Sequence, residues 1–149
     1  MTASTEHLDL LANTTLFSGL SEGTLEKIAA VAREIRSNPG DILMEEGSSA
    51  YGLHVIIDGT ADVMVGTNSV AQLGPGDTFG EIALLDDGVR SATITAMTPI
   101  RVMAIYGATF RETLKTEPEL AHRLVLHLAA LVRELDTQIA DFRTGGSFQ

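Results

Sequence analysis

The alternation of hydrophobic and polar residues divides the chain into three parts. Apolar residues recur at helical spacing over residues 6–13, and Ser21 is suited to cap a second helix at residues 22–33. From Arg36 to Tyr106 the pattern changes to short β-branched runs separated by turn residues, which is typical of antiparallel sandwiches and barrels. Helical spacing then returns for the rest of the chain. The order is therefore helices, strands and helices.

The central part contains several short runs that predict strands, at residues 42–44, 52–57, 60–65, 70–73, 92–96 and 101–106. Asp58-Gly59, between the second and third runs, is a two-residue hairpin signal. The runs recur at short intervals, which predicts roughly seven or eight strands in an antiparallel jelly roll.

The last part predicts a short helix at residues 108–115, a long helix at 117–142 and a flexible tail at 143–149. Apolar residues line two faces of the long helix. One face carries Val125, Val132 and Ile139 at one heptad position and Ala121, Leu128, Leu135 and Phe142 at another; the second carries Leu120, Leu124 and Leu131. Because one barrel covers only one side of a helix, we expect a parallel homodimer through this helix. The alternative is that both faces are buried within one chain.

Together these elements predict a single domain over residues 1–149. Its fold class is α+β, mainly β: an antiparallel jelly-roll β-barrel at residues 36–106, flanked by N-terminal helices at 1–35 and by C-terminal helices at 107–142. A chain of 149 residues with 44% hydrophobic composition is long enough for one well-formed core.

Composition excludes several classes of site. The chain has no cysteine, so disulfides, thiolate zinc sites and iron–sulfur clusters are ruled out. The first residues lack the basic start and apolar run of a signal peptide, and no stretch is long enough to span a membrane. We therefore expect a soluble, cytoplasmic protein with no membrane partner.

Charge distribution points to one residue. A formal net charge of −10 opposes direct binding of nucleic acid, whose phosphates must be neutralised by Lys and Arg. Between Arg36 and Arg101 the only basic residue is Arg90, which stands among nine Asp and Glu residues. From composition alone, Arg90 is a surface residue that offsets a local acidic field; its neighbours suggest a more specific role.

Residues 79–93 interrupt the strand pattern and concentrate donors for an anion. One helical turn after Gly80 leaves backbone N–H groups free to bind an anion. Arg90 can place its planar guanidinium across two phosphate oxygens, and Ser91 adds a hydroxyl donor. Glu81 would repel phosphate but is suited to accept hydrogen bonds from a sugar hydroxyl. A phosphate joined to a ribose satisfies both requirements.

At these positions the sequence resembles the cyclic nucleotide-binding domain family, whose members include the bacterial catabolite activator protein and the regulatory subunits of cyclic-AMP-dependent protein kinase. The resemblance extends over most of the chain: Asn38-Pro39-Gly40-Asp41 and Glu46-Gly47 match the family's first turns, Asp58-Gly59 its central hairpin, and residues 79–93 its phosphate-binding cassette. It implies that Glu81 holds the ribose 2′-hydroxyl and that Arg90 and Ser91 hold the cyclic phosphate. It also implies that the pocket is lined by Gly80, Ile82, Ala83 and Ala92.

The resemblance leaves the choice of base open. Aligned without gaps, the positions that contact the base from the long helix fall on Leu135 and Asp136 rather than on a Thr-Ser pair. A hydroxyl residue at the position of Ser91 accompanies cyclic AMP in some members and cyclic GMP in others. Cyclic AMP is the favoured ligand and cyclic GMP the alternative.

The expected function is that of a stand-alone cyclic nucleotide sensor that signals through its C-terminal helix. The printed sequence does not continue into a DNA-reading domain, so we expect the output to pass through dimer geometry, through an effector protein in trans or through a further domain outside this sequence. The alternative is a binding-incompetent member that serves as a dimerisation or docking module. No catalytic residues, metal ligands or cofactor are predicted, because only His54 of the four histidines lies in the β region and His122 and His127 are about 140° apart on a helix.

Overall fold

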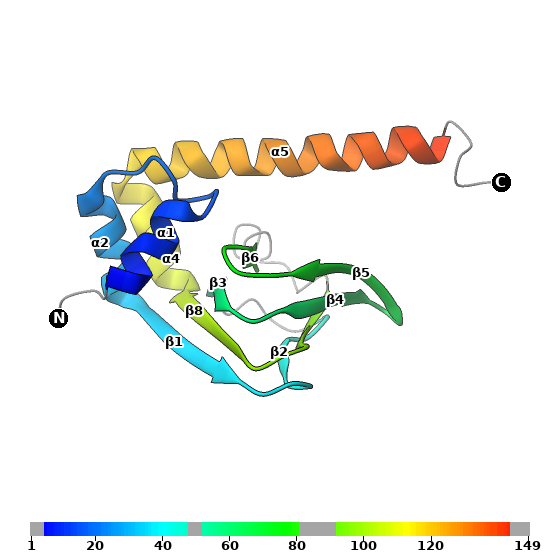
Figure 1. Ribbon diagram of the computed structural model, residues 1–149. Coiled ribbons are helices and arrows are strands. Elements are labelled where there is room, and N and C mark those ends of the chain that lie inside the picture. The colour runs from blue at the N-terminus through cyan, green and yellow to red at the C-terminus, as the bar shows by residue number, and fades with distance from the viewer. Residues whose placement is uncertain (1–4, 48–51, 81–91, 144–149) are drawn as a thin grey trace.

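The computed structural model describes residues 5–47, 52–80 and 92–143, without the side chains at 135, 138 and 141–143. In this part of the chain, helices precede and follow a β region built from two sheets (Figure 1). The predicted order of elements and the α+β, mainly β class are confirmed.

Two helices open the chain. The first is α1 (Thr5–Asn13) and the second is α2 (Glu22–Val31). Ser21 caps α2 as predicted, because its side-chain oxygen accepts a hydrogen bond from the backbone N–H of Thr24 at 3.3 Å. The helix ends two residues before the predicted Arg33, since Ala32 already pairs with Ile105 in a sheet. The predicted start of the β region at Arg36 is therefore wrong, and the first strand begins at Ala32.

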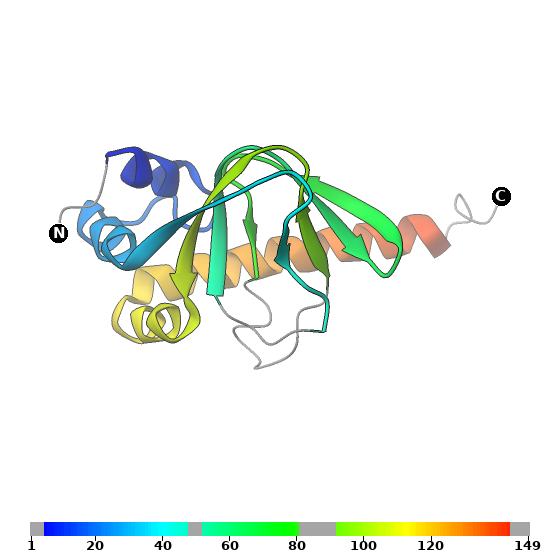
Figure 2. The same ribbon diagram turned by 90° about the horizontal axis from the view of Figure 1, so that it is seen from below.

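The described strands form two four-stranded antiparallel sheets that face each other (Figure 2). The order in the first sheet is β1 (Ala32–Ser37), β8 (Ile100–Tyr106), β3 (Gly52–Asp58) and β6 (Thr78–Phe79). The order in the second is β2 (Ile42–Met44), β7 (Thr93–Ala96), β4 (Ala61–Val65) and β5 (Asn68–Leu73). Each strand thus has its neighbours far away in the sequence, except in the pair β4 and β5.

The turn at Asp58-Gly59 is not the predicted hairpin. It connects β3 in one sheet to β4 in the other, so these two strands do not pair. Gly59 has a φ of +92°, and a Cβ there would lie 2.4 Å from the carbonyl oxygen of Pro99. Glycine is therefore required for close approach to the loop before β8. The two-residue hairpin is instead between β4 and β5, where Val65 pairs with Asn68.

Two hydrophobic clusters hold these layers together. The first lies between the helices and the first sheet and contains Phe17, Phe110 and Met103 among its fully buried side chains. The second lies between the sheets and contains Ile56 and Phe79. Successive residues of β3 alternate between the clusters, as the period of a strand buried on both faces requires.

Two further helices complete the chain, α4 (Gly107–Thr116) and α5 (Pro118–Arg143), close to the predicted bounds. Leu120 and Leu124 enter the first cluster, which confirms that one stripe of the long helix packs on its own domain. Leu128, which the heptad pattern placed on the other stripe, also packs against this cluster. Figure 1 shows α5 continuing past the small helices and above the sheets. No described helix is both long and apolar enough to cross a membrane.

Candidate functional site

The candidate site starts where β6 ends, at Phe79 and Gly80. The ring of Phe79 stacks on His54 of β3, with 4.7 Å between ring centroids and 4° between ring planes. The two residues are directly opposite in the register of β3 and β6, and both are buried. Gly80 follows with a φ of +97°, in the left-handed region that glycine adopts readily. The segment from Gly80 to Ala92, which contains most of the predicted ligand residues, therefore begins at a buried, fixed residue and with a backbone conformation that favours glycine.

The segment ends at Ala92, which is buried and directly precedes β7 in the second sheet. The next residue, Thr93, pairs with Met64 and accepts a hydrogen bond through its Oγ1 from the backbone N–H of Glu46 at 3.0 Å. Ile94 then enters the cluster between the sheets. The two ends of the segment are thus anchored in different sheets.

Glu46 adds a contact that the sequence pattern did not reveal. Its carboxylate accepts a hydrogen bond from the backbone N–H of Gly66 at 2.9 Å, in the hairpin between β4 and β5. Together with its backbone bond to Thr93, this contact ties the chain after β2 to two other points of the second sheet. Only the presence of a carboxylate before Gly47 could have suggested such a role.

Of the residues predicted to bind the ligand, Gly80 and Ala92 are described and mark the two ends of the segment. Glu81, Ile82, Ala83, Arg90 and Ser91 lie outside the described residues, so their roles stay predictions. Asp136 is exposed on α5, and the side chain of Leu135 is not described. Contact of these two residues with a base likewise stays a prediction.

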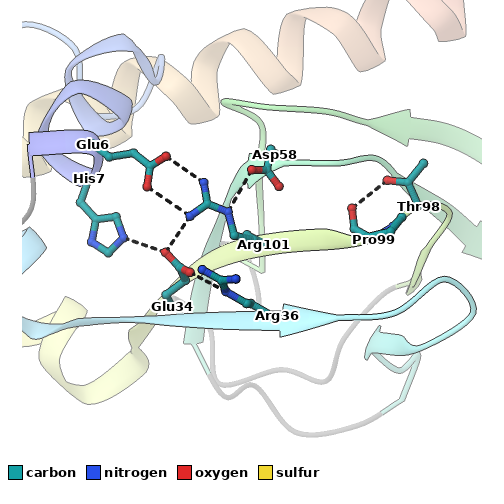
Figure 3. Close-up of polar contacts among 8 residues, drawn as sticks. All are labelled: Glu6, His7, Glu34, Arg36, Asp58, Thr98, Pro99 and Arg101. Atoms are coloured by element: carbon teal, nitrogen blue, oxygen red, sulfur yellow. Dashed lines mark hydrogen bonds and ion pairs between the residues drawn. The ribbon is translucent and has the colours of Figure 1, made fainter.

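A separate ionic cluster lies around Arg101 on β8 (Figure 3). Its guanidinium donates to Glu6 of α1 at 2.8 Å, to Glu34 of β1 at 3.1 Å and to Asp58 at the end of β3 at 2.9 Å. Hydrogen bonds with Glu6 and Asp58 raise the pKa of Arg101. One side chain thus joins the first helix to three strands of the first sheet.

Two carboxylates of this cluster, those of Glu6 and Glu34, have pKa values lowered by their neighbours. The hydrogen bond from Arg101 lowers the pKa of Glu6. Burial acts to raise the pKa of Glu34, but hydrogen bonds from His7 and Arg36, together with the charge of Arg101, outweigh it and lower the value. Both carboxylates are held in the ionised form.

Glu6, His7 and Glu34 also place one potential metal ligand each within 4.8 Å of one another. Two of these three side chains are already hydrogen-bonded to Arg101. A cation at the same carboxylates would be repelled by the guanidinium. The arrangement therefore fits an ion-pair network better than a metal site.

The chain is similar in sequence to cyclic nucleotide-binding domains. The family model of the cyclic nucleotide-binding domain matches residues 34–117. The cAMP-dependent protein kinase regulatory subunit of Dictyostelium discoideum is 30% identical over an alignment of 134 positions that covers 85% of this chain and 41% of that protein. The chain spans between 11% and 62% of the length of the curated relatives that it matches first.

Solved structures show the same fold. The catabolite activator protein of Thermus thermophilus superposes with a TM-score of 0.79 at 26% identity, covering 87% of this chain and 63% of that one. The cAMP-bound structure of PfPKA-R gives a TM-score of 0.72 at 26% identity over 87% of this chain and 46% of that one.

Proposed function

The chain belongs to the cyclic nucleotide-binding domain family, and on this premise we propose that it is a regulatory module that binds a 3′,5′-cyclic nucleotide monophosphate. The observation that carries the proposal is the family match over residues 34–117, which includes the whole segment from Gly80 to Ala92. Glu81 and Arg90 both lie in that segment. A carboxylate is suited to accept from a sugar hydroxyl, and a guanidinium is suited to bind a phosphate.

In this proposal Arg90 and Ser91 bind the cyclic phosphate. The planar guanidinium donates two parallel hydrogen bonds to a phosphate monoanion, which a lysine could not do. Backbone N–H groups of Ile82 and Ala83 add neutral donors. Glu81 accepts a hydrogen bond from the ribose 2′-hydroxyl and thereby discriminates ribonucleotides from their deoxy analogues.

The fold supports the proposal by fixing the ends of the segment. Gly80 follows a buried, stacked Phe79, and Ala92 is itself buried. A binding segment whose ends are held pays less conformational entropy when it closes on a ligand. The proposed ligand is cyclic AMP rather than cyclic GMP. The relatives named above as cAMP-dependent or cAMP-bound support a cyclic nucleotide as the ligand, whereas the choice of cyclic AMP rests on the sequence alone.

The proposed output is a movement of α5. Leu120 and Leu124 anchor its start in the core, whereas Val125, Val132 and Ile139 are 62%, 55% and 47% exposed. A stripe of exposed β-branched residues at heptad spacing fits a parallel homodimer. Ligand binding would alter the packing of α5 and pass the signal to a dimer partner or to an effector protein. The module acts by binding and not by catalysis.

Calorimetry of the full chain with cyclic AMP, cyclic GMP and linear AMP tests the proposal. We expect saturable binding of cyclic AMP, weaker binding of cyclic GMP, and a loss of at least about tenfold, or 1.4 kcal/mol, for linear AMP. Absence of binding by both cyclic nucleotides would instead favour the alternative, a docking or dimerisation module that has lost its ligand.

A further inference from the structure

A concave site of about 190 Å³ lies between β1 and β8, at residues that are not assigned to the nucleotide. It is lined by Val31, Arg33, Ile35, Ala104 and Tyr106. Arg33 and Ala104 are directly opposite each other in the register of the two strands. The cavity therefore belongs to one face of the first sheet, at its edge strand.

The lining residues of this site differ in exposure. Ala104 is 7% exposed, whereas Val31 and Tyr106 are 45% and 54% exposed, so Ala104 is assigned to the floor and the other two residues to the rim. The volume is close to that of a cavity of about 150 Å³ known to accept benzene. An apolar ligand group of about the size of a phenyl ring therefore fits over Ala104, against apolar side chains.

Arg33 gives the cavity a charge. Among the residues that the structure describes, no hydrogen bond or ion pair to Arg33 is found, and its side chain is exposed. In contrast, Arg36 on the same strand is paired with Glu34 at 3.0 Å, and Arg101 on β8 contacts three carboxylates. A guanidinium at the edge of an apolar cavity is suited to a carboxylate, which it can bind through two parallel hydrogen bonds.

We propose that this cavity is a second ligand site, which binds a small carboxylic acid with an apolar group. The carboxylate of the ligand would pair with Arg33, and an apolar group of about phenyl size would lie over Ala104. The same chemistry can come from a small free acid or from the C-terminal aromatic residue of a peptide. The site stands on its own residues and does not depend on nucleotide binding.

The cavity has a structural connection to the proposed nucleotide segment. Arg33, Ala104, His54 and Phe79 are paired in turn across β1, β8, β3 and β6. This cross-strand row ends at the residue before Gly80. A ligand on Arg33 and a nucleotide at the segment would thus occupy opposite ends of one row, without sharing a residue.

The test uses 3-phenylpropionate as a probe of the full chain labelled with ¹⁵N. We expect saturable shifts of the amide signals of Arg33 and Ala104 in the millimolar range, as befits a ligand of this size. Acetate lacks the apolar body and 3-phenylpropanamide lacks the charge, and each should bind at least about fivefold more weakly. The peptide acetyl-Gly-Gly-Phe, with its free carboxylate, distinguishes a peptide source if it binds more tightly than the free acid.

Variants separate the two halves of the site. Arg33→Gln should weaken 3-phenylpropionate at least about fivefold and leave 3-phenylpropanamide unchanged. Arg36→Gln removes the same charge from the same strand but from outside the cavity, and should have no effect. Ala104→Leu should fill the floor and weaken both probes.

Several results would overturn the proposal. One is the absence of saturable shifts at 20 mM probe, about the upper end of the expected millimolar range. Equal binding of acetate would mean that only an exposed cation is present. Equal binding to Arg33→Gln, or complete displacement by cyclic AMP, would place the probe elsewhere. Because wild type and Arg33→Gln decide the question, an Ala104→Leu variant that fails to fold leaves the test intact.

Discussion

The imidazole of His54 lies flat against the phenyl ring of Phe79 and joins the centre of the first sheet to the residue before Gly80. Both rings are buried, at 6% and 4% exposed. Neither ring can shift without disturbing the packing between the sheets. The stack therefore fixes the point from which the proposed nucleotide-binding segment departs.

We predict that His54→Leu will weaken cyclic nucleotide binding by about three- to tenfold, because an apolar side chain of similar size loses the stacked geometry, worth about 1 kcal/mol. His54→Phe keeps a flat ring and should retain most of the affinity. Calorimetry measures both variants, with urea unfolding to confirm that they are folded. Equal losses in the two variants would show that stacking is not the relevant property.

Arg90→Leu should reduce cyclic nucleotide affinity at least about a hundredfold, since removing one partner of a buried charge-assisted pair costs on the order of 2 to 5 kcal/mol. The melting temperature without ligand should not change. Calorimetry and thermal unfolding measure the two quantities. Binding within threefold of wild type would remove Arg90 from the site.

Glu81→Gln keeps the shape of the side chain but loses the charged acceptor. It should weaken 3′,5′-cyclic ribonucleotides by about ten- to a hundredfold while hardly affecting their 2′-deoxy analogues, because only the ribonucleotides carry the hydroxyl that Glu81 would accept from. Titration of the wild type and the variant with both ligands isolates this hydroxyl. Equal losses for the two ligands would assign Glu81 another role.

The exposed stripe of α5 predicts a dimer. The variant Val132→Glu with Ile139→Glu places two charges per chain in the seam, which is the proposed interface between the α5 helices of two chains. Burial of a charge without a partner costs several kcal/mol. Sedimentation should show a dimer for the wild type and a monomer for this variant, and nucleotide affinity should fall less than in Arg90→Leu. Leu128 is not used, because it packs against the core of its own chain.

Ala130 and Thr137 provide the control for this prediction. Both are exposed, are seven residues apart and lie on the side of the helix away from the stripe. Ala130→Glu with Thr137→Glu adds the same charge and should remain dimeric. A wild-type chain that sediments as a monomer at high micromolar concentration would refute the seam itself.

Arg101→Met should lower the melting temperature at pH 7 by a few degrees, about 2 to 6 °C for a chain of this size. The folded-state pKa of Glu6 lies below its ordinary value of 4.5. A lowered carboxylate pKa contributes stability above pH 4.5 that is lost as the pH falls through the folded value. The difference between wild type and variant should therefore be largest near neutral pH and shrink below pH 4.5. Thermal unfolding at several pH values measures it.

Arg36→Met is the matched control for the Arg101 prediction. Arg36 contacts one of the same carboxylates, but its side chain is 74% exposed, and exposed pairs contribute little. Its effect should be smaller at every pH. A constant difference between wild type and Arg101→Met from pH 3 to 7 would mean that packing, rather than these ion pairs, explains the loss.

Local patterns in the sequence predicted the elements well. Ser21 caps the second helix, and the predicted bounds of the two C-terminal helices are correct to within two residues. Runs of β-branched residues mark most of the strands. Capping, helical spacing and alternation act between residues close together in the chain, so the sequence reveals them directly. Most of the candidate ligand residues likewise lie within one short segment, residues 80–92, so the sequence alone suggests their chemistry, and their roles stay predictions.

Tertiary structure decided what depends on distant residues. The Asp58-Gly59 turn is as short as a hairpin, yet β3 pairs with β8 and β6 because the chain changes sheets there. Arg101 gathers carboxylates from residues 6, 34 and 58, and His54 meets Phe79 across strands. By itself the sequence determined which residues are available for helix, strand and phosphate chemistry. The fold decided which of them touch, because cross-strand partners are chosen by the packing of both sheets together and not by their neighbours in the chain.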